Sequence, residues 1–186
     1  GFLEWLGGAA GDVVRRLDCA EPWNRISRDT RDGPGSLVPR VGPFAFSADG
    51  GVLVTVSFIL SEGGGAGRPV VIADEHLVER ATLKFWKRSS GASPPHSPTD
   101  VPPAPYDPVA AMDSPHGSTA GVSHVAVSPA GTAAASSSAQ EDALRLYAHT
   151  RAGWTCAHRL DRPSGPRGRA AALAFAADGS VLASAH

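Results

Sequence analysis

The chain has 186 residues, of which 42% are hydrophobic, so it is long enough to bury a core of its own. Its 21 Gly and 16 Pro stand beside only 6% aromatic residues, a composition typical of strands joined by many turns. The 17 basic and 18 acidic side chains almost cancel and there are only 2 cysteines, which excludes a strongly charged molecule drawn as a whole to nucleic acid or membrane, and also a disulfide framework.

The opening residues 1–6 are mostly apolar around Trp5 and are unlike a signal peptide, so they predict a strand. A second strand is predicted over residues 13–17. No later stretch reaches the roughly 18 apolar residues of a membrane-spanning helix. We therefore expect an intracellular protein. We also expect both ends of the chain to lie inside a longer protein, because it has no initiating Met and stops within a strand-like run.

A repeated unit then occurs three times: an apolar alternation, a turn that ends in Gly, and a second run of apolar or small residues. The three copies begin with residues 44–50, 125–131 and 173–179. The turns contain Asp-Gly or Pro-x-Gly, which supply the positive φ and the fixed φ that tight hairpin turns need. Each copy therefore predicts two antiparallel strands joined by a short turn.

A third strand that ends in an aromatic residue follows the first two copies, over residues 81–86 and 143–147. A fourth strand is predicted over residues 154–160, which completes a four-stranded sheet like the blade of a β-propeller. The last two copies are spaced at close to the roughly 40 to 45 residues of a WD repeat. The first two copies lie almost twice as far apart.

Two segments account for that longer interval. Residues 58–80 form a predicted insertion between the second and third strands. Residues 89–118 are rich in Pro and Ser and poor in apolar side chains, so we expect a disordered loop between blades that does not pair as a strand. The whole chain, 1–186, is thus predicted to be all-β: a partial WD-repeat β-propeller with about two full blades and partial blades at both ends.

The sequence contains no recognisable catalytic set. Its 7 histidines form no His-x-x-x-His or Glu-x-x-His pair, and there is no Gly-x-Ser-x-Gly elbow or phosphate-binding loop that ends in Lys-Ser or Lys-Thr. His124 precedes a predicted strand, where WD repeats often carry a structural histidine that hydrogen-bonds within the blade, and we predict that role for it. We expect no enzyme, cofactor, metal site or small-molecule substrate.

Four arginines, Arg159, Arg162, Arg167 and Arg169, lie in and just after the predicted fourth strand, in a segment rich in Gly and Pro. Arg pairs with phosphate groups in a bidentate way, so this segment is a candidate RNA contact. The alternative is an ordinary solvated loop.

Three Ser-Pro steps within residues 89–118 resemble proline-directed phosphorylation sites; they begin at Ser93, Ser97 and Ser114. A fourth step, Ser128-Pro129, belongs to one of the repeated turns and is predicted to be structural.

The order of these features resembles the WD-repeat propeller subunits of the small-subunit processome, those of the Nan-one type in the transcription-linked UTP-A subcomplex. The similarity lies in the Gly-Trp-Thr-Cys run at Gly153 and in four further stretches, which are residues 1–17, 44–56, 83–86 and 172–183. The Gly-Trp-Thr-Cys run is the most specific of these. Tyr147 departs from the family pattern, which usually has Trp there.

The resemblance implies a non-catalytic scaffold in ribosome biogenesis, located in the nucleolus, that supports rDNA transcription and pre-rRNA processing. Its partners would be other WD-repeat subunits of the processome and pre-rRNA, bound directly or indirectly, with no membrane. Two alternatives stay open on the residues alone. One is a WD-repeat adaptor for protein interactions outside the nucleolus, and the other is a propeller hydrolase, which would need a set of catalytic side chains that the sequence does not display.

Overall fold

The computed structural model describes residues 2–7, 12–19, 37–61, 78–89, 106–117, 121–138, 141, 143–161, 170 and 172–185. The described residues form twelve strands in four antiparallel sheets. The first sheet pairs β1 (Phe2–Gly7) with β2 (Asp12–Asp18). The second contains β3 (Leu37–Phe46), β4 (Val52–Ser61), β5 (Val78–Arg88) and β6 (Tyr106–Asp113). The third contains β7 (His124–Val127), β8 (Ala133–Ser137), β9 (Ala143–Thr150) and β10 (Gly153–Asp161). The fourth pairs β11 (Ala172–Phe175) with β12 (Leu182–Ala185).

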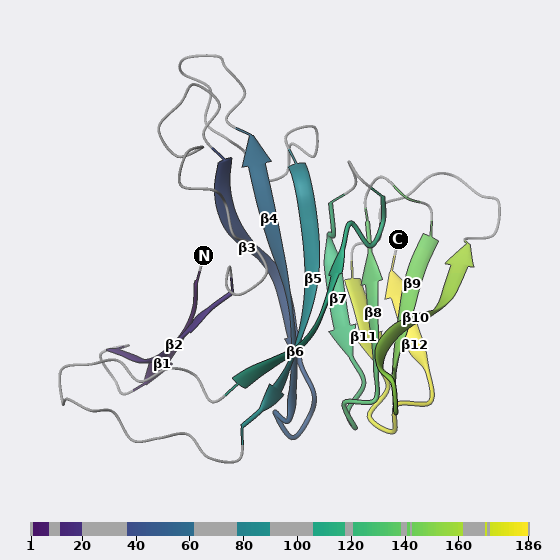
Figure 1. Ribbon diagram of the computed structural model, residues 1–186. Helices are drawn as coiled ribbons and strands as arrows, with labels where there is room; N and C mark the ends of the chain where they lie inside the picture. The colour runs from purple at the N-terminus through teal and green to yellow at the C-terminus, as the bar shows by residue number, and fades with distance from the viewer. Residues whose placement is uncertain are drawn as a thin grey trace.

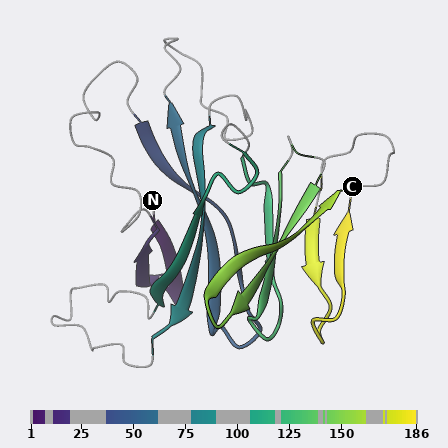
Figure 2. The ribbon, with the colours of Figure 1, turned by 45° about the vertical axis from the view of Figure 1, so that its right-hand side comes forward.

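The four sheets stand side by side in chain order in Figure 2, while in the view of Figure 1 the fourth sheet overlaps the third. In both complete sheets each strand pairs with the next one along the chain. The first strands of successive sheets also lie together, because β3 contacts β7 and β7 contacts β11. This is the arrangement of propeller blades around a common centre. The chain is therefore all-β and a partial WD-repeat β-propeller, with two complete blades between two partial ones, as predicted.

The turns of the three repeats are built alike. Gly50, Gly131 and Gly179 all have positive φ, of 65°, 67° and 74°. Each donates its backbone N–H to the carbonyl oxygen three residues earlier, at 2.9 to 3.0 Å. Neighbouring turns also meet, since the N–H of Ala48 donates to the carbonyl of Pro129 at 3.1 Å. The predicted hairpin turns are thus confirmed, and two of them are joined to each other.

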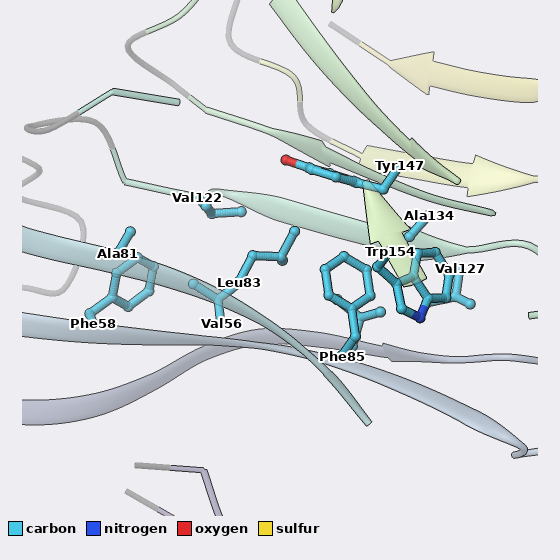
Figure 3. Close-up of a cluster of buried hydrophobic side chains, with 11 residues drawn as sticks. Val56, Phe58, Ala81, Leu83, Phe85, Val122, Val127, Ala134, Tyr147 and Trp154 are labelled. Atoms are coloured by element: carbon cyan, nitrogen blue, oxygen red, sulfur yellow. The ribbon is translucent and has the colours of Figure 1, made fainter. Parts of the chain in front are cut away.

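A core of aromatic and aliphatic side chains fills the space between the second and third blades (Figure 3). The Phe85 ring of β5 stacks on Trp154 of β10, with centroids 4.4 Å apart and planes at 18°. It also meets the Tyr147 ring of β9 edge-on at 5.7 Å. Trp154, the second residue of the Gly-Trp-Thr-Cys run, is therefore an anchor between blades.

One expectation for residues 89–118 is wrong over part of its length. Tyr106–Asp113 is not a loop but β6, the fourth strand of the second blade, and it pairs with β5 from Thr82 to Arg88. Proline is tolerated there because β6 is an edge strand and because the register shifts beside Pro108, where a β-bulge occurs. Residues 90–105 lie outside the described residues.

The predicted insertion over residues 58–80 is shorter than expected. β4 continues through Ser61, and β5 already begins at Val78. The residues between them, 62–77, lie outside the described part of the chain.

Candidate functional site

The third blade contains a chain of four polar side chains that runs from its surface into its interior. Glu141 Oε2 lies 2.5 Å from His116 Nδ1, and His116 Nε2 lies 2.8 Å from Ser136 Oγ. Ser136 Oγ lies 2.9 Å from the hydroxyl of Tyr147. The four residues come from the turn after β6, from β8, from the connection between β8 and β9, and from β9. This hydrogen-bond network therefore ties two strands of the third blade, β8 and β9, to the connection between them and to the turn that precedes the blade.

Burial at His116 and hydrogen bonding at Glu141 determine the charge state of this network. Burial lowers the pKa of His116 below its ordinary value, more strongly than the neighbouring Glu141 raises it. Burial acts to raise the pKa of Glu141, but hydrogen bonds from Arg145 and His116 outweigh it, so the pKa of this carboxyl lies below its usual range. Near neutral pH a neutral His116 therefore donates from Nδ1 to an ionised Glu141 and accepts at Nε2.

The order of Glu141, His116 and Ser136 is that of a serine nucleophile with its base and orienting acid. Access argues against that chemistry here, because the Ser136 side chain is fully buried and its oxygen is also bonded to Tyr147. A nucleophile needs space beside its oxygen for a substrate carbonyl. The geometry instead fits a hydrogen-bond network that holds the blade together.

The third blade contains two structural histidines, of which one was predicted. His124, at the start of β7, hydrogen-bonds within its own blade as predicted, with its Nδ1 3.4 Å from Ser137 Oγ and its side chain half-buried. His116 is buried and bonded on both ring nitrogens. It was missed because it lies in the Pro-rich segment that was assigned to a loop. No spacing pattern pointed to it, because its partners Glu141 and Ser136 are distant in the sequence.

Charged side chains gather where β10 runs beside β9. Arg145 and Arg159 are directly opposite each other in the antiparallel register, an arrangement of like charges that needs compensation. Glu141 supplies it, with its Oε1 at 2.8 Å from Arg145 and 3.6 Å from Arg159. Asp161 lies 2.7 Å from Arg159 as well. The two arginines are thus balanced by two carboxylates.

Of the four arginines proposed to contact RNA, the structure describes Arg159 alone. Its side chain is 53% exposed at the outer edge of the third blade. Arg162, Arg167 and Arg169 lie outside the described residues. An RNA contact by the four remains a prediction, and at Arg159 a phosphate group would have to compete with Asp161.

The structure describes two of the four Ser-Pro steps, those at Ser114 and Ser128. Ser114 has a positive φ of 47° and opens a turn in which its carbonyl accepts from Gly117 N–H at 2.9 Å. It does not lie in the flexible segment that the sequence suggested. Ser93 and Ser97 lie outside the described residues. Ser128 is structural as predicted, since its Oγ accepts from the N–H of Ala133 at 2.9 Å.

The described residues contain no group of three or more His, Cys, Asp or Glu side chains arranged to hold a metal ion. Within the same part of the chain there is no helix long and apolar enough to cross a membrane.

No family model matches the chain, and no curated protein is significantly similar to it in sequence. Several solved structures are similar in shape. One is KlAtg21 in complex with the coiled coil of AgAtg16, with 14% identity and a TM-score of 0.49, over 95% of this chain and 41% of that one. Another is the β-propeller domain of Cps50 (Swd1) from Myceliophteria thermophila, with 12% identity and a TM-score of 0.41, over 78% of this chain and 50% of that one. A third, from a mitotic checkpoint complex, has 15% identity and a TM-score of 0.40, over 78% and 46%. The chain spans half or less of the length of each of these structures.

Proposed function

We propose that this chain is part of a non-catalytic propeller scaffold that works in small-subunit ribosome assembly in the nucleolus. In this role the blades hold loops and strand edges in fixed positions, and other propeller subunits and pre-rRNA bind to those positions. The observation that supports a non-catalytic scaffold is the way in which the third blade uses its buried polar side chains. The one Glu-His-Ser chain in the described residues is sealed inside a blade, where it stabilises the fold and is closed to substrate.

The assignment of this scaffold to the small-subunit processome rests on the resemblance in sequence. The stretches that carry it fall on strands of the kind that the resemblance implies. Residues 1–17 cover β1 and most of β2, residues 44–56 cover the turn between β3 and β4, and residues 83–86 lie within β5. The Gly-Trp-Thr-Cys run opens β10, where Trp154 reaches the neighbouring blade. These placements support the propeller scaffold, and the processome assignment itself is proposed on the sequence resemblance.

The near-zero net charge of the chain limits how strongly it can attract RNA. With a net charge of -1, the chain attracts phosphate only through local groups, so any affinity for pre-rRNA would be modest and sensitive to salt. Protein partners therefore account for most of the proposed assembly, and RNA contact supplements them.

The test is affinity purification of the full-length tagged protein from nuclear extract, at moderate and at high salt, with and without ribonuclease. We expect other processome propellers to remain after ribonuclease treatment and after high salt, and the leader of pre-rRNA to be recovered at moderate salt. Recovery of a reproducible set of non-nucleolar partners without pre-rRNA would favour the adaptor alternative and contradict the ribosomal assignment. Turnover of ester or peptide substrates by the purified protein would contradict the non-catalytic scaffold.

The contribution of Arg159 to RNA recovery can be tested in the same experiment. We expect Arg159→Gln to lower recovery of pre-rRNA by a few-fold at moderate salt and to leave protein partners unchanged, because it removes one exposed phosphate-binding group. Arg151→Gln is the matched control, since Arg151 is also exposed but lies in the turn at the opposite end of β10. Equal loss in both variants would mean that charge in general, and not this position, matters.

A further inference from the structure

The turn after β6 contains the Ser114-Pro115 step and holds it in a strained conformation. Ser114 is the one residue other than glycine with positive φ in the described part of the chain, at 47°. A side chain disfavours this region because its Cβ comes close to the backbone carbonyl that follows. Two bonds keep the turn closed: Ser114 N–H donates to the carbonyl of Ala81 at 2.7 Å, and Gly117 N–H donates to the carbonyl of Ser114 at 2.9 Å. The strain is released whenever this turn opens.

The hydroxyl of Ser114 takes no part in holding the turn. Its side chain is half-buried, and among the described residues the hydroxyl has no hydrogen-bond partner. Ser128, which also precedes a proline, is buried, and its Oγ accepts from the N–H groups of Thr132 and Ala133 at 3.2 and 2.9 Å. Of these two Ser-Pro steps, Ser114 is therefore the one whose hydroxyl becomes available after a local opening alone.

The link from Ser114 to the buried network of the third blade is short. Pro115 alone separates Ser114 from His116, and its ring fixes one of the backbone torsions between them. A displacement of Ser114 is therefore passed on to His116. The His116 ring is one of two side chains bonded to the buried Ser136 of β8, and the other is Tyr147. Movement of His116 thus removes a bond from the interior of the blade.

The charged side chains around this turn already form pairs. Three ion pairs join arginines to carboxylates: Arg80–Asp113, Arg145–Glu141 and Arg159–Asp161. A phosphate group on Ser114 would add a charge of about −1.5 to −2. Asp113 directly precedes Ser114, and Glu141 is bonded to His116 two residues after it. The phosphate would thus be added near two carboxylates whose arginines are already engaged, and repulsion between like charges would oppose closure of the turn.

We propose that Ser114 is phosphorylated by a proline-directed protein kinase, and that the phosphate keeps the turn open and draws His116 out of its bonds to Glu141 and Ser136. The γ-phosphoryl group of ATP is transferred to Ser114 Oγ. The bond from phosphorus to the oxygen of ADP breaks, the bond from phosphorus to Oγ forms, and the hydroxyl proton passes to a base of the kinase. This regulation is independent of the proposed function, because it depends only on contacts around the turn and in the third blade.

The test treats the full-length folded protein with a purified mitogen-activated protein kinase and Mg-ATP, and locates the phosphate by peptide-resolved mass spectrometry. We expect phosphate at Ser114 and much less at Ser128, which is buried and bonded. Hydrogen exchange of the phosphorylated protein should be severalfold faster in β8 and β9 and unchanged in β4. Treatment with a phosphatase should restore the original exchange.

Ser114→Ala is the matched control, because it removes this acceptor hydroxyl and retains every other Ser-Pro step. After kinase treatment its exchange in β8 and β9 should equal that of the untreated variant, so that phosphate elsewhere does not account for the effect. Equal phosphorylation of Ser114 and Ser128 would mean that the kinase acts on the unfolded chain, which would contradict a local opening. Absence of phosphate at Ser114, while a synthetic peptide of residues 106–121 is modified, would overturn the site. Phosphate there with unchanged exchange would overturn its effect on the blade.

Discussion

The second and third blades have the same strand order but bury different chemistry. In the second blade, β4 and β5 fill the interior with large side chains such as Leu83, Phe85 and Trp86. In the third, β8 contributes only Ala and Ser, and Ser136 is bonded to the network that includes His116. A blade can therefore be stabilised by apolar volume or by a buried polar network. The two kinds of interior respond differently to substitution. Apolar packing does not depend on any one polar group, whereas a hydrogen-bond network depends on each of its members.

The largest expected effect is on the aromatic contact that joins the two blades. Phe85→Ala removes a fully buried ring that stacks on Trp154, and it should lower the free energy of unfolding by about 3 to 5 kcal/mol. Urea unfolding of the full-length protein measures this loss. Phe44→Ala is the control, because Phe44 is 50% exposed, and its cost should be below about 1 kcal/mol. Similar costs for both would show that Phe85 does not lie in a packed interface.

Next in size is the loss of the histidine at the centre of the network. His116→Ala leaves Glu141 and the buried Ser136 without their shared partner, so unfolding should become easier by about 2 to 3 kcal/mol. His124→Ala removes only a long contact to Ser137 and should cost less than about 1 kcal/mol. Thermal unfolding of the pair decides between the two histidines. A larger cost at His124 would mean that its bond to Ser137, and not the His116 network, contributes more to the stability of the blade.

Tyr147 permits the two kinds of stabilisation to be separated within one residue. Tyr147→Phe keeps the ring beside Phe85 and removes only the hydroxyl bonded to Ser136, so it should cost about 1 kcal/mol. A double-mutant cycle with Ser136→Ala measures the pair directly, and the double variant should cost less than the sum of the single ones. Strict additivity would indicate that the hydroxyl and Ser136 do not interact.

A change of pH should act on the third blade and spare the second. The pKa of folded His116 lies below its ordinary value of 6.5 because of burial, so the unfolded chain takes up a proton more readily. Stability from His116 is then complete above about pH 6.5 and decreases as the pH falls toward the lower folded value. The lowered pKa of Glu141 adds a further loss in the acid range, below its ordinary 4.5.

Hydrogen exchange between pH 7 and 5, corrected for the intrinsic rate, measures this difference blade by blade. Protection in β8 and β9 should decrease before protection in β4 and β5. His116→Gln should flatten the dependence near pH 6, because its side chain does not titrate. We place this effect last of the four, because His116 changes stability only while the pH lies between its ordinary pKa and its lower folded pKa. An equal loss of hydrogen-exchange protection in both blades over this pH range would contradict the prediction.

The sequence was sufficient for the elements that repeat. The apolar alternation and the glycines at positions 50, 131 and 179 identified the paired strands, and the positive φ of these glycines confirms the turns. These features are local, since a strand and its turn are encoded within about ten residues. The blade count followed from them, with two full blades between partial ones.

The features that were missed depend on contacts between distant residues. β6 was overlooked because the proline content around Pro108 argues against a strand, and only its position at the edge of the sheet makes the proline harmless. His116 meets Glu141 and Ser136 only after β6, β8 and β9 have assembled. Neither a spacing rule nor composition could identify that network, because its partners are chosen by the topology.

The irregular end of the second blade has a consequence for how the molecule behaves in a crowded solution. β6 is the edge strand of its sheet, and a regular edge strand can recruit a strand from another molecule and begin a growing aggregate. Pro108 has no N–H to offer to such a strand, and the bulge beside it disturbs the spacing of the donors and acceptors that remain. Pro108, which argues against a strand when the sequence is considered alone, thus also disfavours edge-to-edge association of this blade with other molecules.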